Sequence, residues 1–165
     1  MKKWFSATVF ASLMLVGCSS DTSSPAAPEH VTIFASAAAY TAWPAVASTA
    51  DDAILVLYTE SDEHMGPDGR IMGVRSTDEG RSWAEPYVVY DTPLDDRESG
   101  ITVLSDGSLV VHLWSTRHTR ESYERMAPGS YLDETVEAWI DTVESPKYQN
   151  AADLEGGHVA RSTDG

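Results

Sequence analysis

The sequence contains a single cysteine, Cys18, among its 165 residues. One cysteine cannot form a disulfide within the chain, and with five scattered histidines it gives no spacing typical of a structural zinc site. Basic residues are also scarce, since 11 Lys and Arg stand against 26 Asp and Glu, for a formal net charge of −15. Affinity for nucleic acid comes largely from lysine and arginine displacing counterions. We therefore expect no disulfide scaffold, no metal, no cofactor and no nucleic-acid partner.

No apolar run is long enough to span a bilayer. The run from Trp4 to Val16 covers about 13 residues, whereas a membrane helix needs roughly 20. Lys2 and Lys3 precede it, and a short positive segment followed by a short apolar one is typical of an export signal. The sequence therefore predicts a signal peptide over residues 1–17.

The end of this signal, Leu15-Val16-Gly17-Cys18, resembles the bacterial lipobox, in which the cysteine carries the lipid. An ordinary secretory signal with an incidental cysteine is the alternative. Residues 18–28 are rich in Ser, Pro and Ala and predict a flexible tether. The resemblance implies lipidation at Cys18, a membrane partner through that anchor, and an exported lipoprotein of the outer membrane or cell surface.

Beyond the tether, short apolar runs rich in β-branched and aromatic residues alternate with turn residues. This pattern is typical of strands joined by hairpins. The sequence therefore predicts an all-β, antiparallel fold for residues 29–165, with strands at 31–34, 53–58, 87–90 and 108–114.

One segment departs from this pattern. Apolar residues recur there at three- and four-residue spacing, at Leu132, Val136, Trp139, Ile140 and Val143. With Asp133 as N-cap and Pro146 as the stop, the spacing predicts a helix from about Glu134 to Val143. We interpret it as an amphipathic insertion packed on the side of a sheet, with the lining of a substrate cleft as the alternative.

The sequence also repeats internally. Residues 48–59 align without gaps with residues 103–114, and Arg75-Ser76-Thr77-Asp78 recurs as Arg161-Ser162-Thr163-Asp164. The spacing between copies grows from 55 residues (48 to 103) to 86 (75 to 161), which places an insertion at the helical segment. Tandem copies of strand, turn and strand are typical of the four-stranded blades of a β-propeller.

The segment from Ser76 to Trp83 fits the pattern S-x-D-x-G-x-x-W. In this pattern the chain resembles the Asp-box (BNR-repeat) propellers, above all the sialidases. The box residues have structural roles: the aspartate and serine bond within the turn, glycine takes a positive φ, and tryptophan packs into the blade. We assign these roles to Ser76, Asp78, Gly80 and Trp83 and, in a second box cut short, to Ser162, Asp164 and Gly165.

The resemblance implies a propeller of sialidase type, of which only the first two or so blades are present, with a short helical insertion in the second. In the family a catalytic aspartate stands on a loop before the first box, where this chain has Asp62, Glu63 and His64. We expect Asp62 to be the general acid and base, with His64 as second candidate. A solvated loop carboxylate is the alternative.

Substrate binding is expected of Arg97, Asp96 and Trp43. Ala42 stands where the family has the arginine of its Arg-Ile-Pro motif, which holds the substrate carboxylate. For Arg97 the alternative is an ion pair with a neighbouring acid, Asp95, Asp96 or Glu98, and for Trp43 it is core packing. We expect an exposed basic loop at Arg117, His118 and Arg120.

The function predicted is that of the N-terminal part of an exported glycoside hydrolase, an exo-α-sialidase or related exo-glycosidase. It would act on terminal sugars of glycans or glycoconjugates, as a monomer when complete. A non-catalytic Asp-box propeller for surface glycan binding or assembly is the alternative, followed by a propeller polysaccharide lyase. The tyrosine and glutamate of the sialidase nucleophile belong to later blades in the family.

Overall fold

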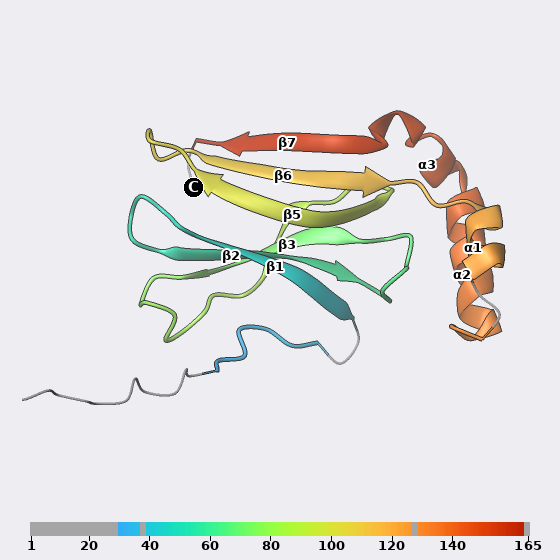
Figure 1. Cartoon of the computed structure of the whole chain (residues 1–165), viewed down its shortest axis with the longest axis horizontal. Helices are drawn as coiled ribbons and strands as arrows, with labels where there is room; N and C mark the ends of the chain where they lie inside the picture. Colours follow the sequence, from blue (N-terminus) through green and yellow to red (C-terminus); the bar gives the residue numbers. More distant parts are fainter. Residues whose placement is uncertain (1–29, 37–38, 127–128, 164–165) are drawn as a thin grey trace, which may run out of the picture. The chain divides into compact units, whose positions relative to one another are not determined.

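The computed structural model describes residues 30–36, 39–126 and 129–163 (Figure 1). The expected signal peptide, the lipidation site Cys18, the tether, and Asp164 and Gly165 of the second Asp box lie outside these ranges. His30 and Val31, which belong to a separate N-terminal unit, are exposed. The rest of the description concerns the unit that begins at Thr32.

The first sheet is a four-stranded antiparallel meander. Its strands follow one another in chain order: β1 (Tyr40–Ser48), β2 (Ile54–Ser61), β3 (Arg70–Ser76) and β4 (Tyr87–Tyr90). The register of β1 against β2 shifts between Ala42 and Ala45, where Trp43 has a φ of 53°. Pro44 lies within this bulge of an edge strand, a position that tolerates a residue without an N–H.

The second sheet has three antiparallel strands among the described residues, β5 (Asp95–Val103), β6 (Leu109–Thr116) and β7 (Gly156–Ser162). Strands β1 and β2 recur 55 residues later as β5 and β6, and β3 recurs 86 residues later as β7. The bulge recurs too, between Arg97 and Gly100, with Glu98 at a φ of 51°. The sequence repeat is therefore a structural repeat, and we call β1 to β4 the first repeat and β5 to β7 the second.

The two sheets pack against each other through apolar side chains of β2, β3 and β6 (Figure 1). Strand β2 is buried on both faces, because Leu55 and Leu57 point to this interface while Val56 and Tyr58 point to a second cluster. Such burial explains the nearly continuous apolar run of β2. All-β architecture with two antiparallel sheets is thus shown.

The strand predicted at 31–34 is wrong, because this segment forms no regular structure. Ile33 and Phe34 cover the first sheet instead, and Phe34 stacks on Tyr58 with 5.4 Å between ring centroids. Apolar β-branched residues are as well suited to covering a sheet face as to forming a strand, so the run alone could not tell the two apart.

Between β6 and β7 the described residues form three helices and a short 3₁₀ turn: α1 (Arg120–Met126), α2 (Asp133–Glu144), α3 (Pro146–Gln149) and η1 (Ala152–Leu154). The predicted helix is confirmed as α2, but its N-cap is Leu132, so Asp133 is the first helical residue rather than the cap. Helix α2 ends at Glu144, with Ser145 as its C-cap, and Pro146 begins α3. No helix in the described part of the chain is long and apolar enough to cross a membrane.

Candidate functional site

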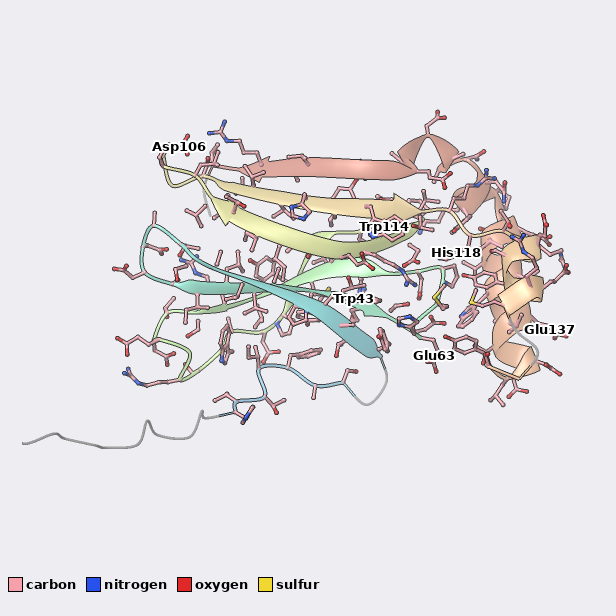
Figure 2. All side chains as sticks on the ribbon, in the orientation of Figure 1. Trp43, Glu63, Asp106, Trp114, His118 and Glu137 are labelled. Atoms are coloured by element: carbon pink, nitrogen blue, oxygen red, sulfur yellow. The ribbon has the colours of Figure 1, made fainter. Side chains whose placement is uncertain are left out.

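The candidate residues gather at one end of the sheets, where β1 and β5 begin and β2 and β6 end. Glu63 and His118 lie toward this end, and Asp106 lies at the opposite one (Figure 2). The helical insertion is at the same end because it follows β6. We call this end the site end, and we call the other, with the β1–β2 and β5–β6 turns and the Asp box, the turn end.

Asp62 lies on the loop between β2 and β3, and its carboxylate is exposed but tightly bonded. Its Oδ2 accepts a hydrogen bond of 2.7 Å from the indole Nε1 of Trp139 in α2. Its Oδ1 accepts one of 2.7 Å from the backbone N–H of Glu63. The preferred candidate for general acid and base is therefore held in a fixed orientation by donors from two elements.

The other two candidates of this loop differ from Asp62 in their contacts. His64 is exposed, and its Nδ1 lies 2.8 Å from the hydroxyl of Tyr40 on β1. The rings of Tyr40, Trp43 and His64 contact one another, with centroids 5.2 to 5.8 Å apart. Glu63 is exposed to solvent. The structure thus brings Trp43 and His64 into one aromatic group beside Asp62.

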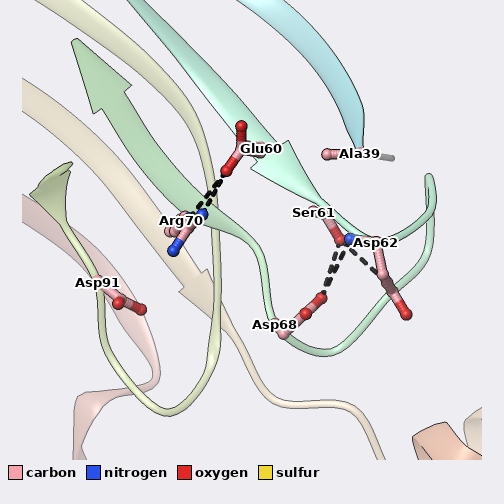
Figure 3. Close-up of a pocket in the computed structure, with 7 residues that line it drawn as sticks. All are labelled: Ala39, Glu60, Ser61, Asp62, Asp68, Arg70 and Asp91. Atoms are coloured by element: carbon pink, nitrogen blue, oxygen red, sulfur yellow. Dashed lines mark hydrogen bonds and ion pairs between the residues drawn. The ribbon is translucent and has the colours of Figure 1, made fainter. Parts of the chain in front are cut away.

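A pocket of about 390 Å³ opens beside Asp62 (Figure 3). Its charged lining is mostly acidic, consisting of Glu60, Asp62, Asp68, Arg70 and Asp91. The one arginine is paired, because Arg70 bonds Glu60 at 2.5 Å. Partial removal from water, and then the negative charge of Asp62, raise the pKa of the Asp68 carboxyl. The pocket therefore holds a carboxyl group with a raised pKa, and its one arginine is paired.

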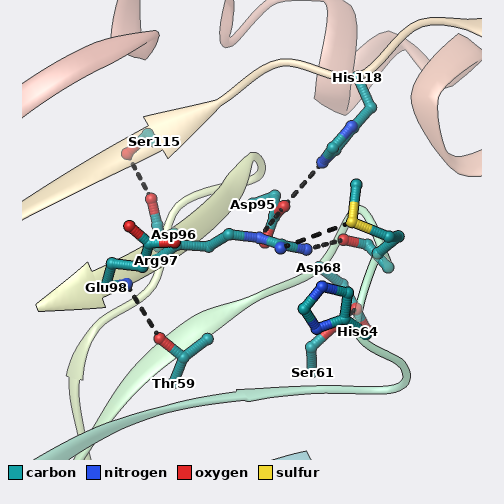
Figure 4. A network of polar contacts seen from close by, with 12 residues as sticks. Thr59, Ser61, His64, Asp68, Asp95, Asp96, Arg97, Glu98, Ser115 and His118 are labelled. Atoms are coloured by element: carbon teal, nitrogen blue, oxygen red, sulfur yellow. Dashed lines mark hydrogen bonds and ion pairs between the residues drawn. The ribbon is translucent and has the colours of Figure 1, made fainter. Parts of the chain in front are cut away.

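Arg97 is buried at the site end, with 6% of its surface exposed. Its Nε donates to Asp95 (Figure 4). Its guanidinium lies 5.5 Å above the ring of Trp43. The same oxygen, Oδ2 of Asp95, lies 2.7 Å from Nε2 of His118. Of the alternatives for Arg97, the ion pair with Asp95 is the one that forms.

His118 corrects a prediction, because it is buried with 8% of its surface exposed rather than part of an exposed basic loop. Its ring stacks on Tyr123 of α1 at 5.2 Å, and its backbone N–H donates to the hydroxyl of Tyr148 at 2.7 Å. The insertion thus folds over this histidine, while Arg120 stays exposed and pairs with Glu144.

Asp96 has no exposed surface. It accepts hydrogen bonds from the backbone N–H and hydroxyl of Thr92, at 2.6 and 3.0 Å, and from the hydroxyl of Ser115. Burial raises the pKa of Asp96, and these donors oppose that effect. Asp96 therefore links β6 to the segment before β5 through hydrogen bonds, and its burial keeps it out of reach of a substrate.

The Asp box forms the turn after β3 at the turn end. The hydroxyl of Ser76 bonds Asp78 at 2.9 Å and accepts from the backbone N–H of Gly80 at 2.9 Å, and Gly80 has a φ of 83°. Hydrogen bonds from the Ser82 hydroxyl and N–H lower the pKa of Asp78 to about 2. Trp83 packs against the outer cluster of the first sheet. Ser162 of the second box ends β7.

Sequence reasoning missed Asp95, His118 and Trp139 as parts of the site. Extending the 55-residue alignment toward the N-terminus would have placed Asp95 opposite Tyr40, at the start of equivalent strands. No sequence signal pairs Trp139 with Asp62, because 77 residues separate them. Within residues 30–36, 39–126 and 129–163, no group of three or more His, Cys, Asp or Glu residues is placed to hold a metal ion.

No protein-family model matches the sequence, and no curated protein matches it either. Among solved structures, the crystal structure of a protein of unknown function from Dyadobacter fermentans DSM 18053 is similar, with a TM-score of 0.57 and 21% sequence identity. The match covers 82% of this chain and 36% of that one, so this chain spans about a third of its length. At this identity the similarity shows the fold alone.

Proposed function

We propose that the chain is the N-terminal part of an exported, lipid-anchored bacterial glycoside hydrolase built on a β-propeller of sialidase type. Its two repeats would be the first blades of that propeller, and Cys18 would carry the lipid at the outer membrane or cell surface. The substrate would be a terminal sugar of a glycan, and Asp62 would protonate the glycosidic oxygen and then activate water.

The observation that carries this proposal is the position of Asp62. An oriented carboxyl group borders a pocket of about 390 Å³ at the end of the sheets opposite the Asp box. A second carboxyl group, Asp68, shares that pocket and has a raised pKa. Glycosidic bond cleavage uses two carboxyl groups at one site, and a raised pKa is typical of the one that acts as the acid.

The charges at the site favour a neutral sugar over a sialic acid. Bidentate binding of a substrate carboxylate needs a free arginine. Ala42 cannot supply one, Arg97 is buried against Asp95, and Arg70 is paired with Glu60. The remaining charged groups of the pocket are acidic and would repel a carboxylate.

The test is hydrolysis by the complete gene product of a panel of 4-methylumbelliferyl glycosides that includes neutral sugars and the sialoside. We expect release of the fluorophore from a neutral member of the panel, and at least a hundredfold loss of kcat in Asp62→Asn because the acid is removed. Asp106→Asn, at the turn end, is the matched control and should keep its turnover.

Two outcomes would contradict the proposal. Equal turnover in Asp62→Asn and the unmodified protein would mean that Asp62 is not the acid and base. Absence of turnover across the panel, with the protein folded, would favour the second candidate function, a non-catalytic propeller that binds glycans. The paired state of Arg70 and Arg97 and the two bonds on Asp62 support that candidate, because groups held this way can form a rigid binding surface.

A further inference from the structure

The helical insertion of the second repeat reaches the β2–β3 loop of the first repeat through two hydrogen bonds. The indole Nε1 of Trp139 donates to Asp62 at 2.7 Å, and the hydroxyl of Tyr123 donates to the carbonyl of Met65 at 3.1 Å. The side chain of Met65 also packs against the apolar cluster of the insertion. The loop and the insertion are therefore connected by both polar and apolar contacts.

Trp139 is well suited to fix the direction of a partner. Only 2% of its surface is exposed, and its ring lies between Tyr123, at 5.2 Å, and Tyr131, at 4.8 Å. An indole N–H is a donor only, so in this position it needs an acceptor. The acceptor it finds is the carboxylate of Asp62, although that residue is exposed to water.

Another tryptophan shows that this arrangement is not the general state of buried indoles in the chain. The Nε1 of Trp83 is also buried but has no hydrogen-bond partner within residues 30–36, 39–126 and 129–163. Both tryptophans pack against apolar clusters, Trp139 fully buried and Trp83 partly buried, and of the two buried indole N–H groups only that of Trp139 has an acceptor. Packing against an apolar cluster alone therefore does not explain why the Trp139 N–H points at Asp62.

The loop is shaped to admit the carboxylate at this place. A Cβ on Gly66 would lie 1.8 Å from Oδ1 of Asp62 and 2.7 Å from the hydroxyl of Ser61, so only glycine leaves room for the observed rotamer. The carbonyl oxygen of Gly66 in turn accepts a hydrogen bond of 3.4 Å from the guanidinium of Arg97. The loop is thus held at Asp62, at Met65 and at Gly66 by residues of the second repeat.

We propose that Trp139 is a positioning residue, and that the helical insertion of the second repeat sets the direction of the Asp62 carboxyl beside the pocket of the first. For the chemistry of Asp62 this inference rests on the proposed function. The insertion then has a defined role: it carries the donor that holds an exposed acidic side chain in one rotamer. An exposed aspartate without such a donor would sample several rotamers and spend less time in a productive one.

The test compares Trp139→Phe with Trp83→Phe in the complete gene product. Both changes keep an aromatic ring packed against an apolar cluster, but only the first removes a hydrogen bond. We expect kcat to fall about ten- to a hundredfold in Trp139→Phe with KM within about twofold, because orientation rather than binding is lost. Trp83→Phe should keep both constants. Equal kinetics in the two variants would overturn the proposal.

A second measurement does not depend on turnover. In ¹H–¹⁵N spectra, Asp62→Ala should move the indole resonance of Trp139, since it removes the acceptor, and leave that of Trp83 in place. An unmoved Trp139 resonance would refute the hydrogen bond and with it the positioning role. If the resonance moves while no glycoside is hydrolysed, the proposed function fails, and the hydrogen bond between Trp139 of the insertion and Asp62 of the loop remains as a structural finding.

Discussion

The two repeats are alike at the turn end. Arg75 pairs with Asp51 in the first repeat, and Arg161 pairs with Asp106 in the second, at positions related by the offsets of 86 and 55 residues. Asp52 and its counterpart Gly107 both have a positive φ, of 62° and 83°. The same turn is therefore built twice with nearly the same interactions.

At the site end the repeats differ. Tyr40, Thr41 and Ala42 begin β1, whereas Asp95, Asp96 and Arg97 begin β5 at the equivalent positions. A short loop follows β2, whereas the helical insertion with α1, α2 and α3 follows β6. The backbone frame, bulge included, is common to both repeats, while the charged side chains and the insertion are not. The comparison teaches that the repeat encodes the fold, and that the candidate chemistry depends on where the copies diverge.

The largest effect is expected from removing the arginine that distinguishes the second bulge from the first. Arg97→Ala leaves the fully buried Asp95 without its arginine, with the ring of His118 as its remaining side-chain partner. Breaking one side of a buried ion pair costs about 3–5 kcal/mol, because a buried charge loses its compensation. Urea unfolding of the variant should show a free energy of unfolding lower by this amount.

The control for this prediction removes both charges of the ion pair at the second bulge, because the first bulge has none at the equivalent positions. Adding Asp95→Asn to Arg97→Ala removes the uncompensated charge and should restore part of the loss, at least about 1 kcal/mol. In the first repeat, Ala42→Arg should bring no gain in stability, because Tyr40 stands where Asp95 stands in the second. If the double variant is no more stable than Arg97→Ala, the ion pair is not the source of the effect.

The next largest effect is expected in the β2–β3 loop, which stands in the first repeat where the second has the helical insertion. In Gly66→Ala the new methyl group would take the place of the Asp62 carboxylate. Since a side chain can swing away, we expect a modest loss of stability, about 1 kcal/mol for the displaced hydrogen bond with Trp139. Turnover should fall as strongly as in Trp139→Phe. In Gly157→Ala of β7, where a Cβ meets nothing within 4 Å, both should be unchanged.

The sequence predicted the frame far better than the site. Alternation, turn residues and the internal repeat located β2, β4 and β6, and the three- and four-residue spacing located α2. These features are local, so each is visible in a short window of sequence. The segment at 31–34 failed because its apolar run packs on a sheet without joining it.

The site was less predictable because its contacts join distant segments. Arg97 and His118 meet at Asp95, and Trp139 meets Asp62, through the packing of the insertion on the loop. Composition and spacing indicate which residues are charged, but the burial that decides their roles is a tertiary property. His118 shows this directly, since a basic stretch in the sequence became a buried histidine in the fold.

The smallest effect is expected at the turn end, where the repeats agree. Arg75→Met and Arg161→Met each remove a partly exposed ion pair, and each should lower the melting temperature by no more than about 3 °C. The hydroxyl of Thr49 lowers the pKa of Asp51 from 3.8, and the hydroxyl of Ser108 lowers that of Asp106. The ionised carboxylates therefore stabilise the fold above pH 3.8, and this stabilisation is lost as the pH falls below that value. Thermal unfolding of the two variants and the unmodified protein at pH 7, at high salt and below pH 3.8 measures this. A loss confined to one variant would show that the turns, although equivalent in position, do not contribute equally, and the difference between the repeats would then extend over their whole length.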